Sequence, residues 1–262
     1  MTTVVLTMID GMRPDAMQAT PTPTLDRIRQ RGAWTLTARS VMPSITLPCH
    51  VSMFYSQPPQ RHGVTSNTWT PMARPLPSIV DQAALFNRHC AFFYSWEELR
   101  DLSQPGSLQY AYFRKHDPED VLADNPVVEA AIRYQQAEHP DFLFLYLGTT
   151  DNIGHLNGWM SPEYLAQISR VDGLLGQFME SLSDQDTILV QADHGGHERS
   201  HGTDSPEDMT VPWMIAGPGI RQNHQIQRSV NLIDTAPTLA RLLGVQPHSG
   251  WEGRCVDEAF LD

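Results

Sequence analysis

The sequence predicts an α/β domain with a mostly parallel central sheet and helices on both of its faces. Short apolar runs alternate along the chain with segments whose apolar residues recur at helical spacing. Strands separated by helices form βαβ units, and such units build parallel sheets that helices cover. The 262 residues are 40% hydrophobic and 18% charged, a globular composition that can bury such a sheet. We therefore expect a single domain over residues 1–262.

Four apolar segments predict buried strands, because each is rich in β-branched or aromatic residues and Asp or Gly soon follows it. These segments are Val4–Ile9, Phe142–Leu147, Thr187–Val190 and Val211–Ala216. Helical patterns are found over Pro23–Arg31, from about Pro162 to Leu182, and over Leu232–Leu243. The stretch from Leu76 to Pro126 has weaker periodicity. We expect a small cap or an excursion from the sheet around residues 76–126.

The charge and cysteine content exclude several classes of protein. Lys and Arg number 18 against 30 Asp and Glu, a net charge of −12, so the surface as a whole repels nucleic acid and anionic membranes. No apolar run is long enough to span a bilayer, and the N-terminus lacks the basic region of a signal peptide. Three cysteines cannot form a paired framework, which indicates a reducing, cytoplasmic compartment. To bind an anionic substrate, a protein with this net negative charge needs a locally positive site, and we expect a metal ion to provide it.

Aspartates stand at the ends of three predicted strands, at positions 10, 151 and 193. A single such aspartate is more often a turn former or a helix cap than a ligand. Three at one edge are different, because ligands of parallel sheets bind beyond the carboxyl ends of the strands. Histidines accompany two of them, at positions 155, 194, 197 and 201. A mixed Asp and His set suits zinc or another divalent transition ion, whereas calcium and magnesium prefer oxygen.

A hydroxyl lies in the segment PSITLPCH, where Thr46 stands directly before Leu47-Pro48 and a helix could begin. A helix N-terminus favours an incoming anion, and a hydroxyl becomes a nucleophile when a base or a metal activates it. Taken alone, the segment indicates no more than a helix start. Cys49 and His50 invite a cysteine-nucleophile interpretation, but no Asn or Asp that would orient the histidine is evident.

In this order along the chain, these elements resemble the alkaline phosphatase superfamily. The similarity is greatest to its nucleotide pyrophosphatase/phosphodiesterase branch, which carries T-x-P-x-H, H-G-x-x-x-N and D-x-x-G-H elements. They correspond here to Thr46–His50, His62–Asn67 and Asp151–His155, followed by Asp193-His194 and His201-Gly202. The resemblance extends from residue 10 to the final predicted helix.

The resemblance implies two divalent metal ions, most simply zinc, with manganese as the alternative. One ion would be held by Asp151, His155 and His201, and the other by Asp10, Asp193 and His194. Thr46 would contact the second ion as the nucleophile and form a phospho-threonine intermediate, while Asn67 would donate a hydrogen bond to a phosphoryl oxygen. Only six residues separate His194 from His201, so the site should be more open than in larger relatives, and His197 competes with His201 as the third ligand.

The implied activity is hydrolysis of small phosphate esters, with a phosphodiesterase preferred because a neutral asparagine at position 67 suits a diester. A phosphomonoesterase and a phosphonate hydrolase of the phosphonoacetate type remain as alternatives, and a non-catalytic binder of phosphorylated ligands is a third. A sulfatase lacks support, since the [CS]-x-P-x-R element is missing. Three aromatic residues, Trp69, Tyr94 and Trp96, have two interpretations. Aromatic residues belong more often to the core, and the alternative is that these three stack on a ring of the substrate. Oligomeric state stays open.

Overall fold

An eight-stranded sheet forms the centre of the computed structural model, which describes residues 2–115 and 117–261. The strand order is β4-β3-β5-β1-β6-β7-β2-β8. The strands are β1 Val4–Ile9, β2 Ala33–Arg39, β3 Cys90–Tyr94, β4 Tyr110–Phe113, β5 Phe142–Leu147, β6 Thr187–Gln191, β7 Thr210–Ala216 and β8 His224–Gln225. Neighbouring strands from β4 to β6 are parallel, whereas β7 is antiparallel to both β6 and β2.

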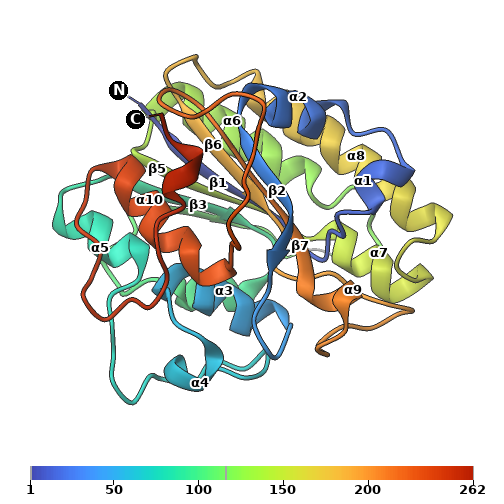
Figure 1. Ribbon diagram of the computed structural model, residues 1–262, viewed down its shortest axis with the longest axis horizontal. Helices are drawn as coiled ribbons and strands as arrows, with labels where there is room; N and C mark the ends of the chain where they lie inside the picture. Colours follow the sequence, from blue (N-terminus) through green and yellow to red (C-terminus); the bar gives the residue numbers. More distant parts are fainter. Residues whose placement is uncertain (1, 116, 262) are drawn as a thin grey trace.

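Helices cover both faces of the sheet, as Figure 1 shows, with α2, α6, α7 and α8 on one side and α3, α5 and α10 on the other. The helices are α1 Ala16–Ala19, α2 Pro23–Arg31, α3 Thr46–Tyr55, α4 Pro59–His62, α5 Ile79–Leu85, α6 Asn125–Glu138, α7 Thr149–Asn157, α8 Pro162–Met179, α9 Pro206–Met209 and α10 Thr235–Leu243. Three short 3₁₀ helices are η1 Glu97–Leu102, η2 Leu232–Asp234 and η3 Asp257–Ala259. The predicted mostly parallel α/β fold is confirmed.

The central strands explain why the candidate ligands meet. Strand β1 lies between β5 and β6 and is parallel to both, with Ile9 opposite Leu147 and Met8 opposite Gln191. All three strands are buried along their whole length, as expected of a parallel sheet that is covered on both faces. Their carboxyl ends therefore deliver residues 10, 148–151 and 192–194 to one edge of the sheet.

The four predicted strands and the three predicted helices all form, with small differences at the ends of two strands and two helices. The helix expected to reach Leu182 ends at Met179, and the last helix begins at Thr235 after a 3₁₀ turn. The strand predicted at Val211–Ala216 runs against its neighbour β6, because the chain returns from β6 through a loop and α9 at the same edge, without a crossover helix.

The stretch 76–126, for which a cap or an excursion was expected, joins the main sheet through its described residues. It forms α5, β3, η1 and β4, and β3 and β4 extend the sheet beyond β5. Its weak periodicity has a physical reason. Strand β3 is buried on both faces and shows no alternation, whereas β4 is a short and mostly exposed edge strand.

No helix among the described residues is long and apolar enough to cross a membrane.

Candidate metal centre

Asp10 is the first residue after β1, and the structure buries it completely. Gly11 follows with a φ of +67°, and a Cβ there would lie 3.1 Å from the Cα and the carboxylate of Asp151, so glycine allows the two strand ends to approach. The Gly11 N–H donates to Asp193 Oδ1 over 3.2 Å. One turn thus brings together the three aspartates that the sequence placed at strand ends.

Asp193 and His194 follow β6 and are both fully buried. His194 Nε2 lies 3.3 Å from Asp10 Oδ1 and 3.4 Å from Asp193 Oδ2. His194 Nδ1 contacts the Gly195 carbonyl at 2.8 Å. A carbonyl oxygen only accepts, so Nδ1 donates to it, and Nε2 is the ring nitrogen that faces the two carboxylates and is placed to coordinate a cation with them. We call Asp10, Asp193 and His194 the inner set.

Asp151 and His155 lie on α7, four residues apart and therefore on one face of the helix. The short helix was not predicted, because its segment TTDNIGHLN has no apolar periodicity. Asp151 Oδ2 lies 3.5 Å from His155 Nε2, and Asp151 Oδ1 lies 3.6 Å from His201 Nε2. We call Asp151, His155 and His201 the outer set. Asp151 also lies within 4.8 Å of Asp10 and His194, so it joins the two sets.

The two histidines of the outer set face each other with their Nε2 atoms 3.1 Å apart. His155 Nδ1 donates to the Arg199 carbonyl over 3.0 Å, and His201 Nδ1 donates to the Ser44 carbonyl over 2.8 Å. Because its low pKa keeps the His201 ring neutral with the proton on Nδ1, His201 Nε2 presents a lone pair on the side that faces His155. Ligand atoms at zinc distances on a tetrahedron are roughly 3.3 Å apart, close to the spacing observed here.

His197 does not join either set. Its Nδ1 bonds to Asp208 Oδ1 over 2.7 Å, while His201 occupies the position beside Asp151 and His155. The His201 ring also stacks on the His194 ring, with centroids 3.8 Å apart and an interplanar angle of 12°. Of the two histidines that compete in the sequence, the structure brings His201 to the other ligands.

Thr46 is the first residue of α3, directly after the extended Ile45. Its Oγ1 lies 3.2 Å from His194 Nε2, which places the hydroxyl against the inner set. The first N–H groups of a helix have no partner within the helix, and they attract an anion. The helix start that the sequence predicted at this position is therefore also a place where a phosphoryl group can bind.

Asn67 lies in the loop after α4 and reaches the same helix start. The Leu47 N–H donates to Asn67 Oδ1 over 3.0 Å. Because the side-chain oxygen accepts this bond, the Asn67 amide nitrogen remains as a donor beside Thr46. The role that the resemblance implies for Asn67, a hydrogen bond to a phosphoryl oxygen, stays a prediction.

The residues present fit divalent cations, judged by their unpartnered atoms. Each of the three aspartates has one fully buried oxygen without a hydrogen-bond partner among the described residues. These are Asp10 Oδ1, Asp151 Oδ1 and Asp193 Oδ2. Burial of a carboxylate oxygen without a partner is costly, and a cation among the three would remove that cost. Together with three imidazole nitrogens, they form the nitrogen and oxygen donor set that zinc and manganese accept.

The electrostatics also call for a cation. Burial, together with the carboxylates of Asp193 and Asp151, raises the pKa of Asp10 well above its usual value. Burial likewise raises the pKa of Asp151. Burial and the nearby His194 lower the pKa of His201 to about 3, so this imidazole is neutral and able to coordinate. Both raised pKa values mean that negative charge on Asp10 and Asp151 is unfavourable unless a cation lies close to them.

Two residues of the site were not found from the sequence. The Tyr146 hydroxyl donates to Asp10 Oδ2 from β5, and the Trp159 indole nitrogen donates to the Gly11 carbonyl over 2.9 Å. Trp159 also packs edge-on against His155, and a Cβ on Gly196 would lie 2.3 Å from its ring. The sequence signal for Tyr146 was a polar hydroxyl within the otherwise apolar strand FLFLYL. No sequence pattern pointed to Trp159.

The other candidate nucleophile, Cys49, and two further histidines near Thr46 have structural roles. Cys49 is buried, and burial raises the pKa of its thiol well above the usual value. His50 Nδ1 donates to the Thr46 carbonyl over 2.8 Å and its ring packs edge-on against Tyr146. His62 Nε2 bonds to Ser52 Oγ over 2.9 Å beneath the same helix. None of the three belongs to the ligand sets.

Trp69 and Trp96 are partly buried against the core, and Tyr94 is part of it. Trp96 additionally lines a cavity of about 290 Å³ together with Lys115 and Asn152, the residue after Asp151. Of the three aromatic residues considered from the sequence, Trp96 is therefore the one that shares a cavity with a residue of α7, the helix that carries Asp151 and His155.

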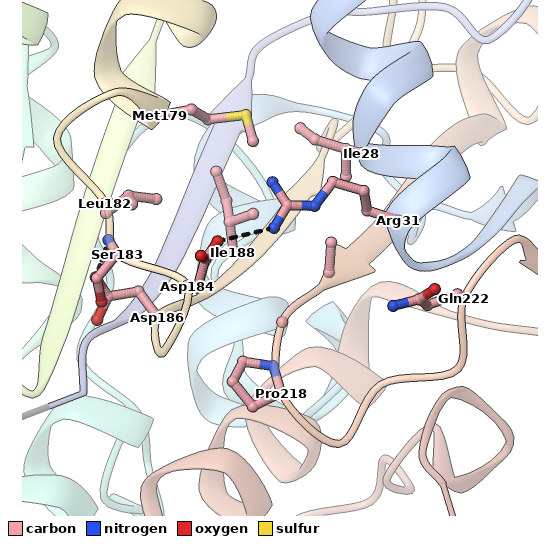
Figure 2. Close-up of a pocket in the computed structure, with 12 residues that line it drawn as sticks. Ile28, Arg31, Met179, Leu182, Ser183, Asp184, Asp186, Ile188, Pro218 and Gln222 are labelled. Atoms are coloured by element: carbon pink, nitrogen blue, oxygen red, sulfur yellow. Dashed lines mark hydrogen bonds and ion pairs between the residues drawn. The ribbon is translucent and has the colours of Figure 1, made fainter.

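A second cavity of about 230 Å³, shown in Figure 2, lies at the other end of the sheet. Arg31 and Asp184 form an ion pair across it over 3.3 Å, and Met179 and Leu182 line its apolar side. Ile188 lies at the start of β6, whereas Asp193 and His194 follow the end of the same strand. This cavity is therefore separate from the metal centre.

Solved structures with the same fold identify the class of protein. An inactive variant of murine ectonucleotide pyrophosphatase/phosphodiesterase 5 in complex with AMP is 17% identical, with a TM-score of 0.80 over 95% of this chain and 97% of that chain. A phosphonate monoester hydrolase from Silicibacter pomeroyi is 15% identical, with a TM-score of 0.76 over 97% of this chain and 76% of that chain. The fold is that of the alkaline phosphatase-like proteins.

A sequence model of the type I phosphodiesterase / nucleotide pyrophosphatase family matches residues 4–82 and 83–209, which is most of the chain. The chain belongs to this family of hydrolase-like proteins. It is 24% identical over 220 residues to ectonucleotide pyrophosphatase/phosphodiesterase family member 3 of Rattus norvegicus, covering 75% of this chain and 25% of that protein. It is 28% identical over 164 residues to GPI ethanolamine phosphate transferase 3 of Schizosaccharomyces pombe, covering 61% and 17%. The chain thus spans a quarter or less of these relatives.

Proposed function

We propose that this protein is a metal-dependent hydrolase of small phosphate esters, with a preference for diesters and with Thr46 as its nucleophile. The observation that carries the proposal is the convergence of Thr46 with both ligand sets at one edge of the sheet, Thr46 Oγ1 being 3.2 Å from His194 Nε2. The relative in complex with AMP is inactive through a threonine-to-alanine substitution, which supports an essential threonine.

Two divalent ions, zinc or manganese, would neutralise the three buried carboxylates and stabilise the attacking and leaving oxygens of the phosphoryl group when bound. Tyr146 holds Asp10, and the Gly11 N–H holds Asp193, so each carboxylate keeps its other oxygen free for a cation. Backbone carbonyls hold the rings of His194, His155 and His201 in the same way. Such second contacts fix the orientation of ligands before the ions arrive.

The residues around Thr46 carry the chemical step. Thr46 Oγ1 lies 3.2 Å from His194 Nε2, the nitrogen that would hold the inner ion, so the hydroxyl would lie against that ion, which would favour loss of the hydroxyl proton to water. Attack by Thr46 Oγ1 forms a bond to phosphorus and breaks the bond to the leaving alcohol, and water then hydrolyses the phospho-threonine. The Asn67 amide nitrogen and the Thr46 backbone N–H would stabilise charge on the phosphoryl oxygens.

The cavity lined by Trp96, Lys115 and Asn152 would receive the organic group of the ester, because Asn152 belongs to α7, the helix that carries Asp151 and His155. A neutral donor at Asn67 favours a diester, which carries one negative charge less than a monoester. A reducing, cytoplasmic compartment is also proposed, on the ground that all three cysteines are unpaired, two of them buried. Cell fractionation would test that location.

The test of the proposed function is the ratio of kcat/KM for bis-p-nitrophenyl phosphate to kcat/KM for p-nitrophenyl phosphate, measured with zinc-loaded and with manganese-loaded protein. A ratio well above one is expected. A ratio well below one would make the protein a monoesterase, and absence of turnover on both would leave phosphonates as the next substrates to test.

A further inference from the structure

The short loop between His194 and His201 is held by residues of the short helix α9, which precedes β7. The Gly195 N–H donates to the Asp208 carbonyl over 2.8 Å, and the Gly196 N–H donates to the Glu207 carbonyl over 3.0 Å. His197 and Ser200 then exchange two backbone hydrogen bonds, each 2.9 Å long, and close a tight turn. Residue Glu198 takes a φ of +49° within this turn.

The carbonyls of this turn position the outer set. The Arg199 carbonyl accepts the bond from His155 Nδ1 over 3.0 Å, and the Glu198 carbonyl accepts the Trp159 N–H over 2.7 Å. Trp159 in turn packs against His155, with ring centroids 5.0 Å apart. A displacement of the turn would therefore move His155, although this residue belongs to another segment of the chain.

A buried carboxylate ties the two ends of the loop together. Asp208 is fully buried, and its Oδ1 bonds to His197 Nδ1 over 2.7 Å. Its Oδ2 accepts two bonds from Thr203, from the N–H over 2.8 Å and from Oγ1 over 2.7 Å. The Thr203 carbonyl accepts the Ser44 hydroxyl over 2.7 Å, and the Ser44 carbonyl accepts His201 Nδ1 over 2.8 Å. One network thus extends from Asp208 to His201.

We infer that the His197–Asp208 pair is a clasp that positions both histidines of the outer set. On the turn side, His197 fixes the carbonyl that holds His155. On the Thr203 side, Asp208 fixes the segment that holds His201 through Ser44. The clasp is a positioning pair, and it rests on the proposed function, because it assumes that the outer set holds a metal ion.

The charge state of the pair agrees with this role. Burial alone would raise the pKa of Asp208, but the hydrogen bonds from His197 and Thr203 outweigh it and lower that pKa. The same bond to Asp208 raises the pKa of His197. A bond between an ionised carboxylate and an imidazole is stronger than one between neutral groups. His197 can be replaced without opening the core, since its side chain is 36% exposed.

The experiment compares His197→Ala with a matched control, His224→Ala. His224 also pairs with an acid, Glu258, over 3.0 Å and is 32% exposed, but it lies at β8, on the far edge of the sheet from β3 and β5. Zinc-loaded protein is titrated with a chelator, and zinc retained per chain is measured by mass spectrometry. Wild type and His224→Ala should each hold two ions. His197→Ala should release one ion at a roughly 10- to 100-fold lower chelator concentration and keep the other, as loss of a residue that orients a ligand does.

A second variant and a second readout complete the test. Asp208→Asn should behave as His197→Ala, and the double variant His155→Ala/His197→Ala should bind zinc no more weakly than His155→Ala, because both changes act on one ion. Excess zinc should restore the kcat of His197→Ala. Identical titrations of His197→Ala and wild type, or equal weakening of both ions, would overturn the clasp while leaving the proposed function intact. A wild-type protein that holds fewer than two ions would overturn the metal centre, and the clasp with it.

Discussion

The inner and outer ligand sets perform related tasks in very different surroundings. Side chains of the inner set are 0–1% exposed, whereas His155 of the outer set is 43% exposed and Asp151 is 13% exposed. The inner residues follow the adjacent strands β1 and β6, so the register of the sheet fixes them. The outer residues lie on a short helix and a loop, and hydrogen bonds to carbonyls fix them. We therefore expect the inner ion to stay bound as long as the core is folded, and the outer ion to exchange with solvent.

The largest effect should come from Thr46, which contacts the inner set without belonging to the three-residue groups around either ion. Thr46→Ala removes the nucleophile and should lower kcat/KM for the diester by at least about 10³-fold while the zinc content stays at the wild-type value. Thr46→Ser retains a hydroxyl and should recover part of the activity. Steady-state kinetics and metal analysis of the same samples provide both readouts. Activity of Thr46→Ala within a few-fold of wild type would contradict the mechanism.

Substitution of one ligand from each set should show that the two ions differ in how tightly they are bound and in whether added zinc restores activity. Asp10→Asn keeps the shape and the contact with Tyr146 but removes a fully buried charge, so the inner ion and the activity should both be lost. His155→Ala should weaken the outer ion by roughly 10- to 100-fold, and added zinc should restore turnover because that site opens to solvent. Zinc per chain and kcat as a function of free zinc are the measurements. If added zinc restored the activity of Asp10→Asn but not that of His155→Ala, the inner ion would be the one that exchanges with solvent, which contradicts our expectation.

How well the two sets could be predicted from the sequence follows from how they are built. Asp10 and Asp193 end apolar strands, so a strand pattern and the rule for parallel sheets locate them. The spacing of Asp151 and His155 pointed to a pair, but the helix that aligns them has no apolar stripe and was missed. The choice between His197 and His201 depends on the fold of a six-residue loop, which the structure decides through Asp208 and Ser44.

Some strands were not predicted for the same reason, because their place in the sheet depends on contacts that are distant in the sequence. Strand β2 contains the alternating AWTLTAR and lies between β7 and β8, far from its sequence neighbours in the sheet. Strand β3, CAFFY, is buried, but it lies in a stretch of weak periodicity. Local pattern identifies strands whose burial is continuous and whose ends are marked by turn residues. Strands that depend on distant partners leave a weaker signal.

A smaller effect concerns the free energy of unfolding of the metal-free protein. The raised pKa of Asp10 means that its contribution to stability is present below the unfolded value of 3.8 and is lost as pH rises through the folded pKa. In chelator, Asp10→Asn should therefore be more stable than wild type at neutral pH, by about 1–3 kcal/mol, and the difference should vanish in acid. In zinc the order should reverse. Urea unfolding at several pH values measures both, and a destabilised Asp10→Asn in chelator at neutral pH would contradict this account.

The smallest effect comes from His62, which lies outside both sets and should respond to pH with the opposite sign. Burial lowers its pKa to about 4. The Val64 N–H donates to Nδ1 over 3.1 Å and Nε2 bonds to Ser52, so protonation breaks a contact that the folded state uses. The unfolded chain binds a proton at about pH 6.5, so stability falls as pH drops from there toward 4, by at most about 3 kcal/mol. His62→Asn should reduce this slope equally in zinc and in chelator. A slope that disappears on zinc binding would assign the titration to the ligand histidines instead, because zinc competes with protons for those and not for His62.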